Sequence, residues 1–286
     1  MIDYLSEPLQ YDYMINAIWI SALVGAVCAF LSAFLMLRGW SLIGDALSHA
    51  VVPGVAGAYI LGLPFALGAF ISGGLAAGAM LFLNSRTKLR QDAIIGLVFT
   101  SFFGLGLFMI SLSPSSVNIQ TIALGNILAI SPTDSIQMVL ITGTSLAVLS
   151  FLWRDLMVVF FDESHARTIG LKPDRLKFIF FVILAGSTVA ALQTVGAFLV
   201  VAIVIIPGAT AYLLTDRFSY LLIWSVIIGT LTCGAGAYLS YFTNGATGGV
   251  IVILQGLVFA FVFFFSPKYG QFAAKRRRAK FQAERT

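Results

Sequence analysis

The chain has 286 residues, of which 59% are hydrophobic and 10% are charged. Its mean hydropathy is +0.97, whereas ordinary soluble domains carry about 25% charged residues. This composition excludes an ordinary soluble domain and predicts an all-α, polytopic transmembrane helical bundle. The length allows about eight to ten spans of roughly 20 residues each, and it leaves no room for a separate soluble domain.

The formal net charge of +5 has its densest source in a basic tail over residues 268–286. Such a tail alone could indicate binding to nucleic acid or anionic lipid. After a membrane bundle it indicates the cytoplasmic side instead, and we expect no nucleic-acid partner. The two cysteines, Cys28 and Cys233, lie in apolar runs and are interpreted as small packing residues.

Apolar segments long enough to cross a bilayer recur from one end of the chain to the other, so residues 1–286 are predicted to form a single membrane domain with a bundle over 15–267. The stretch 178–214 is interrupted only by Gln193, Thr194 and Gly196. It is either two spans with a tight turn or one span with a re-entrant segment. We therefore expect eight to nine spans. The segments are 16–37, 42–61, 65–83, 93–112, 135–157, 177–193, 197–214, 219–240 and 250–266.

Positive residues predict the orientation of the bundle. With nine spans, four groups of basic residues all fall on one side of the membrane. They are the basic residues of 86–90, those of 167–177, Arg217 and the tail. Because cytoplasmic loops are enriched in lysine and arginine, the C-terminus is predicted to be cytoplasmic and the N-terminus external. Residues 1–13 carry acids and no base, which fits the external side, and no cleavable signal peptide is visible.

Asp45 and His49 are an acid and an imidazole inside one predicted span. Their spacing places both side chains on the same face of a helix. Ionisable groups at membrane depth are costly and usually face a water-filled path, a partner charge or an ion. One interpretation is a buried structural pair. The other is a metal site. Small and polar neighbours favour it because a pathway-lining helix has this character, and these neighbours are Ser41, Gly44, Ser48 and Gly54.

A carboxylate oxygen with an imidazole nitrogen suits manganese, ferrous iron or zinc, and no nearby cysteine biases the pair toward softer metals. Two ligands are too few for tight binding. That incompleteness fits a transported ion, because a transit site must release what it binds. We therefore expect no permanently bound cofactor, only a divalent metal in passage.

The most polar internal segment surrounds His165, over residues 161–176. Glu163 to Ile169 is predicted to form a short helix that Gly170 closes, with Pro173 shortly after. The segment is either a solvated loop or a compact knob for a docking partner. We interpret His165 as a surface or interface residue and not as a metal ligand.

Two prolines lie within predicted spans, Pro53 and Pro207. A proline removes one helical hydrogen bond and its ring crowds the preceding turn. Both residues are therefore candidate kinks.

These motifs together resemble the integral membrane permeases of bacterial ABC importers for manganese, iron and zinc, most closely the manganese and chelated-iron branch. The run Arg38 to Ala56, which contains Asp45, His49 and Pro53, is the specific part of the resemblance. Supporting blocks are Glu7 to Tyr11, Gly125 to Leu128, Phe161 to Gly170, Gly196 to Gly208 and Ala246 to Gly249.

The resemblance implies a permease in the bacterial plasma membrane that pairs with a second permease subunit, either an identical copy or a paralogue. It also implies cytoplasmic ATP-binding subunits and an extracytoplasmic metal-binding protein. Asp45 and His49 are implied to contact the ion. Glu163, His165, Ala166, Arg167 and Gly170 are implied to couple to the ATPase, since Ala166 to Gly170 follows the Ala-x-x-x-Gly pattern of importer coupling loops.

The sequence contains no Gly-x-x-x-x-Gly-Lys-Ser/Thr stretch, so the chain is not expected to hydrolyse ATP and is not predicted to be an enzyme. ATP binding to the partner subunits is expected to drive alternating access. Two other classes fit parts of the sequence. An ion-coupled secondary transporter explains an intramembrane acid, and a membrane anchor or receptor leaves Asp45 purely structural.

Overall fold

The computed structural model describes residues 6–40, 42–112, 127 and 131–266, and within these residues the chain forms helices and no strand. The predicted basic tail over 268–286 lies outside the described residues. The elements are η1 (Glu7–Gln10), α2 (Asp12–Arg38), α3 (Leu42–Ala50), α4 (Val52–Leu61), α5 (Phe65–Arg86), α6 (Gln91–Leu112), α8 (Pro132–Phe161), α9 (Glu163–Thr168), α10 (Pro173–Val195), α11 (Ala197–Leu214), α12 (Phe218–Thr243) and α13 (Thr247–Phe265).

The fold class is the predicted one, a helical membrane bundle, but the predicted eight to nine spans are slightly too many. Among the described residues, seven helices are long and apolar enough to cross a membrane. The predicted span 42–61 is instead two helices of 9 and 10 residues, α3 and α4. The predicted span 197–214 forms α11, of which the stretch Val200–Leu214 is a shorter apolar helix that is not among the seven.

Helix α2 is the central helix of the bundle, and it packs against α8, α10, α11 and α12. In its most apolar stretch, 78% of the residues are buried inside the protein. Near its end Phe34 is fully buried and meets the rings of Phe160, Phe180 and Phe218 at centroid distances of 5.8, 5.9 and 5.0 Å. Edge-on aromatic contacts at such distances are favourable, so the end of α2 from which α3 continues is firmly placed.

The break between α3 and α4 follows from Pro53, which lies in the first turn of α4, where a missing N–H costs nothing. The carbonyl of Ala50, left at the end of α3, accepts a hydrogen bond from Ser72 Oγ of α5 at 2.6 Å. An unpaired carbonyl inside an apolar bundle is costly. The buried serine therefore makes an interrupted helix tolerable at this depth.

Pro207 is accommodated differently, because α11 continues through it without a break. Ser32 Oγ of α2 donates to the carbonyl of Ile205 at 3.1 Å and accepts the N–H of Gly208 at 2.9 Å. Gly208 lies so close to Ser32 that a Cβ added to it would approach the hydroxyl to 2.4 Å. The proline region of α11 is thus clamped directly onto the central helix.

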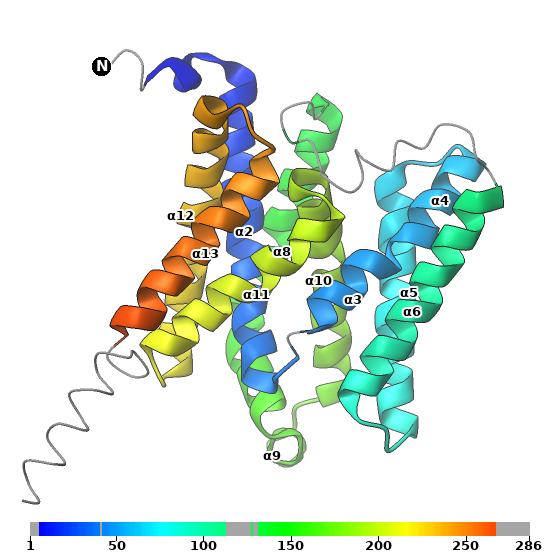
Figure 1. Ribbon diagram of the computed structural model, residues 1–286. Helices are drawn as coiled ribbons and strands as arrows, with labels where there is room; N and C mark the ends of the chain where they lie inside the picture. The colour runs from blue at the N-terminus through cyan, green and yellow to red at the C-terminus, as the bar shows by residue number, and fades with distance from the viewer. Residues whose placement is uncertain (1–5, 41, 113–126, 128–130, 267–286) are drawn as a thin grey trace, which may run out of the picture.

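Figure 1 shows the described connections that carry basic residues, those between α5 and α6, around α9, and between α11 and α12, at the lower end of the bundle. The first described element, η1, and the start of α2 lie at the opposite, upper end. This distribution has the form that the positive-inside rule requires of a membrane protein.

Gly54 provides a test of the packing that holds α4 in place. A Cβ at Gly54 would lie 2.0 Å from the carbonyl oxygen of Gly68 in α5, which is backbone and cannot move aside. Because overpacking a tight contact costs about 1–3 kcal/mol, Gly54→Ala is expected to lower the thermal unfolding midpoint in detergent by several degrees. Gly74→Ala on α5 is the control, since its Cβ meets nothing within 4 Å. Equal midpoints for the two variants would contradict this packing.

Candidate functional site

Helix α3 brings Asp45 and His49 together as the sequence predicts. The Nε2 of His49 lies 3.3 Å from Asp45 Oδ1. The His49 side chain is 15% exposed and the Asp45 side chain is 40% exposed. A carboxylate that remains partly open beside a nearly buried imidazole leaves room for a third participant.

The rest of α3 is built to hold this pair against the bundle. Ile43, Leu47 and Ala50 are buried, and the helix packs against α5, α6, α10 and α11. Gly44 allows the close approach to α11, where a Cβ would come within 2.9 Å of Val204. One side of α3 therefore packs against other helices, while Asp45 lies on the partly open side.

Two phenylalanines of α6 form a wall beside His49. The rings of Phe99 and Phe103 each lie 5.3 Å from the imidazole, edge to face. They stack on each other at 5.9 Å with an angle of 9° between their planes. A wall of this kind restricts rotation of the imidazole, so α6 fixes how the His49 nitrogens are presented.

The predicted coupling segment contains the short helix α9, which begins with a well-formed cap. The Asp162 carboxylate accepts the backbone N–H groups of Ser164 and His165 at 2.9 and 3.0 Å. Gly170 has a positive φ of 86°, which a glycine adopts without strain. Ala166 is buried, while the backbone turn leaves His165 exposed.

Glu163 is the electrostatic centre of this segment. Its carboxylate pairs with Arg167 at 3.0 Å, with Lys177 of α10, and with Arg38 of α2 at 3.9 Å. Partial burial acts to raise the pKa of Glu163, but the hydrogen bonds from Lys177 and Arg167 outweigh it, and the pKa lies below its ordinary value. Through these pairs α9 is attached to both α2 and α10.

The structure brings together some predicted residues and separates others. Asp45 and His49 lie in one helix, whereas Glu163, Arg167 and Gly170 belong to the lower end of the bundle (Figure 1). Within the described part of the chain, no cluster of three or more His, Cys, Asp or Glu side chains forms a complete metal site. The described residues of one copy thus present a carboxylate and an imidazole together, and not a closed coordination sphere.

The family comparison is consistent with this geometry. The pattern of the ABC 3 transport family matches residues 10–266. The chain is 60% identical to the chelated iron transport system membrane protein YfeC of Yersinia pestis, over 97% of this chain and 94% of that protein. It is 46% identical to the manganese transport system membrane protein MntB of Synechocystis, over 96% of this chain and 90% of that one.

Among solved structures, the chain is similar to PsaBC from Streptococcus pneumoniae in complex with Fab. The TM-score is 0.84 and the identity 34%, and the match covers 96% of this chain and 100% of that one. Sequence and fold therefore agree on the same class of membrane protein.

The aromatic wall gives a testable consequence. Because an aromatic pair contributes about 0.5–1.5 kcal/mol beyond burial, replacing Phe99 or Phe103 with Ala is expected to slow metal uptake roughly two- to tenfold. The measurement is initial manganese uptake at matched membrane levels. Phe108→Ala is the control, since Phe108 lies on the same helix and is 60% exposed. Uptake by both wall variants at the control rate would contradict the assignment.

The Glu163 cluster predicts a pH-dependent stability. Its lowered folded-state pKa means that the ion pairs contribute fully above the ordinary pKa near 4.5 and are lost as pH falls through the folded-state pKa. At pH 7, Glu163→Gln is expected to lose about 1 kcal/mol of unfolding free energy, and the difference from wild type is expected to vanish in acid.

The control is a double-mutant cycle with Lys177→Met, measured by thermal unfolding across pH. The two substitutions remove one shared interaction, so their effects are expected to be less than additive. Fully additive effects, or a difference that persists in acid, would contradict the ion-pair explanation.

Proposed function

Because this chain belongs to the ABC 3 transport family, we propose that the ion it moves is a transition metal dication that passes between Asp45 and His49. Manganese and ferrous iron are the first candidates, and zinc is a further one. As a family member the chain is the membrane permease subunit of a metal ABC transporter and not an enzyme. The ion-coupled secondary transporter and the membrane anchor are therefore set aside.

The observation that carries the proposal is the pairing of His49 with a carboxylate that stays 40% exposed on a helix in an apolar bundle. A lone charge at this depth is costly unless it meets an ion or a partner. Two ligands from one chain bind weakly. A second permease subunit, identical or paralogous, that presents the same pair would supply a four-ligand transient site of nitrogen and oxygen donors.

An ABC importer permease works with an ATP-binding subunit and a substrate-binding protein. We assign the lower end of the bundle, with α9 and the basic connections, to the cytoplasm. The extracytoplasmic metal-binding protein then delivers its ion at the opposite end. The exposed polar side chains of α9, with Ala166 buried beneath them, suit a helix that docks in a groove of the ATP-binding subunit.

The mechanism that fits these parts is alternating access. ATP binding closes the ATP-binding subunits, α9 moves with them, and the path opens on the other side of the metal site. The ion is held by Asp45 and His49 only during this passage. Asp45 contributes charge, and His49 contributes a neutral nitrogen donor whose orientation the Phe99 and Phe103 wall restricts.

The test compares metal content by elemental mass spectrometry in metal-starved cells that express the complete transporter. Asp45→Ala and His49→Ala are each expected to abolish accumulation at matched membrane levels, because each removes one of the two ligand types. Asp92→Ala is the control, since Asp92 is an exposed acid in the first turn of α6. The element that wild type accumulates identifies the substrate.

The same comparison can overturn the proposal. Accumulation by both ligand variants at the wild-type level would make Asp45 and His49 a structural pair. The transport path would then lie elsewhere in the bundle.

A further inference from the structure

The link between α2 and α3 has a fixed geometry. Gly39 has a φ of +70°, and its N–H bonds the carbonyl of Met36 at 3.3 Å. The N–H of Trp40 bonds the carbonyl of Leu35 at 2.8 Å. This is the hydrogen-bonding pattern of a glycine-terminated helix. The Trp40 carbonyl in turn accepts the N–H of Ile43 at 3.1 Å, so Trp40 also starts the first turn of α3.

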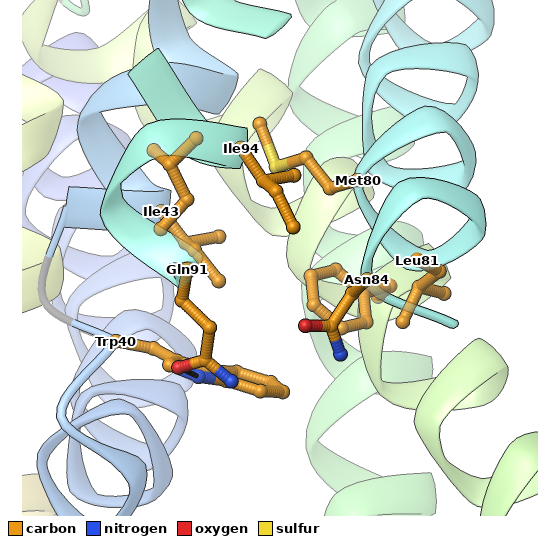
Figure 2. A pocket seen from close by; sticks show the side chains of 9 residues that line it. Trp40, Ile43, Met80, Leu81, Asn84, Gln91 and Ile94 are labelled. Carbon is orange, nitrogen blue, oxygen red and sulfur yellow. Dashed lines mark hydrogen bonds between the residues drawn. The ribbon is translucent and has the colours of Figure 1, made fainter. Parts of the chain in front are cut away.

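The Trp40 side chain is held by three other helices and is only 4% exposed. Its ring meets Phe160 of α8 at 5.4 Å and Phe181 of α10 at 5.6 Å. Its indole N–H donates a hydrogen bond to Oε1 of Gln91, which is the first residue of α6. Figure 2 shows the two side chains meeting at the edge of a small hollow of about 30 Å³, which Ile43, Met80 and Asn84 also line.

Two contacts connect this side chain to α9. The guanidinium of Arg38 lies 5.6 Å over the Trp40 ring and 3.9 Å from Glu163 of α9. Phe160, which touches the ring directly, is two residues before the α9 cap Asp162. A shift of α9 therefore reaches Trp40 through an ion pair and through the end of α8.

Two contacts also connect Trp40 to the metal site. It precedes α3, which carries Asp45 and His49 five and nine residues further on, and its indole holds the start of α6, which carries Phe99 and Phe103. The two helices that shape the surroundings of His49 thus meet at one indole.

We propose that Trp40 is a positioning residue that transmits the movement of α9 to Asp45 and His49, and that its bond to Gln91 makes α3 and α6 move together. The proposal rests on the proposed function of α9 and of the metal pair. Without the indole N–H, α9 still moves with the ATP-binding subunits, but α3 and α6 no longer follow it as one unit.

The experiment uses the full transporter, with its ATP-binding subunits and binding protein, in proteoliposomes supplied with Mn²⁺. The readout is the number of manganese ions imported per ATP hydrolysed. Trp40→Phe keeps an aromatic ring and removes the donor, so we expect this ratio to fall about five- to tenfold, as the loss of one buried hydrogen bond suggests. ATP hydrolysis is expected to stay within about twofold of wild type.

Two further variants sharpen the result. Gln91→Met removes the acceptor at similar length and is expected to lower the ratio equally, with no additional loss in the double variant. Trp224→Phe is the matched control, since Trp224 lies on α12 and is 45% exposed, and its ratio is expected to equal that of wild type. If Trp40→Phe does not assemble, Gln91→Met alone provides the test.

The outcomes separate this proposal from the proposed function. A wild-type ratio for Trp40→Phe or Gln91→Met overturns the coupling role, and so does a parallel fall of transport and ATP hydrolysis, which indicates a merely structural residue. Asp45→Ala is measured alongside. If that variant imports manganese normally, the metal pair itself is wrong, whatever the Trp40 variants do.

Discussion

The rest of the structure depends on the cost of placing a carboxylate and an imidazole within an apolar bundle. A polar helix at that depth must satisfy its backbone from neighbouring helices, because no water is available in the hydrocarbon region. Here the helix ends at Ala50, one residue after His49, and Ser72 of α5 satisfies the buried carbonyl of Ala50. The short α3 that results can be positioned by its neighbours independently of α4.

Three groups of contacts determine where α3 lies. Helix α2 fixes its start through Gly39, and α11 meets it closely at Gly44 because that residue has no side chain. Helix α6 covers His49 with Phe99 and Phe103. Asp45 and His49 are therefore fixed by elements that also reach the basic end of the bundle. A pair held in this way can respond to events at that end without any change in its own residues.

The pairing of Asp45 with His49 could be predicted from sequence because the signal is local. Asp45 and His49 are four residues apart in an apolar run, and their spacing alone places them on one face. The apolar segments likewise gave the helical membrane class, and the cap and turn residues around Glu163 and Gly170 indicated a short helix.

The remaining features of the fold and of the site could not be predicted from sequence, because they depend on contacts between residues far apart in the chain. The break at Val51 requires Ser72 to be present on another helix, and hydropathy alone merged α3 and α4 into one span. Phe99 and Phe103 are two among 25 phenylalanines, and only the packing of α6 on α3 distinguishes them. The pairing of Arg38 with Glu163 likewise joins residues whose sequence neighbourhoods give no sign of each other.

The central claim is that the imidazole of His49 binds the metal in transit. The most direct measurement is pulsed electron paramagnetic resonance of Mn²⁺ added to the purified, assembled transporter, which detects nitrogen atoms bonded to the metal. We predict a ¹⁴N coupling in wild type that is absent from His49→Ala and persists in Phe108→Ala. A bound Mn²⁺ without nitrogen coupling in wild type, or with the same coupling in His49→Ala, would contradict the account.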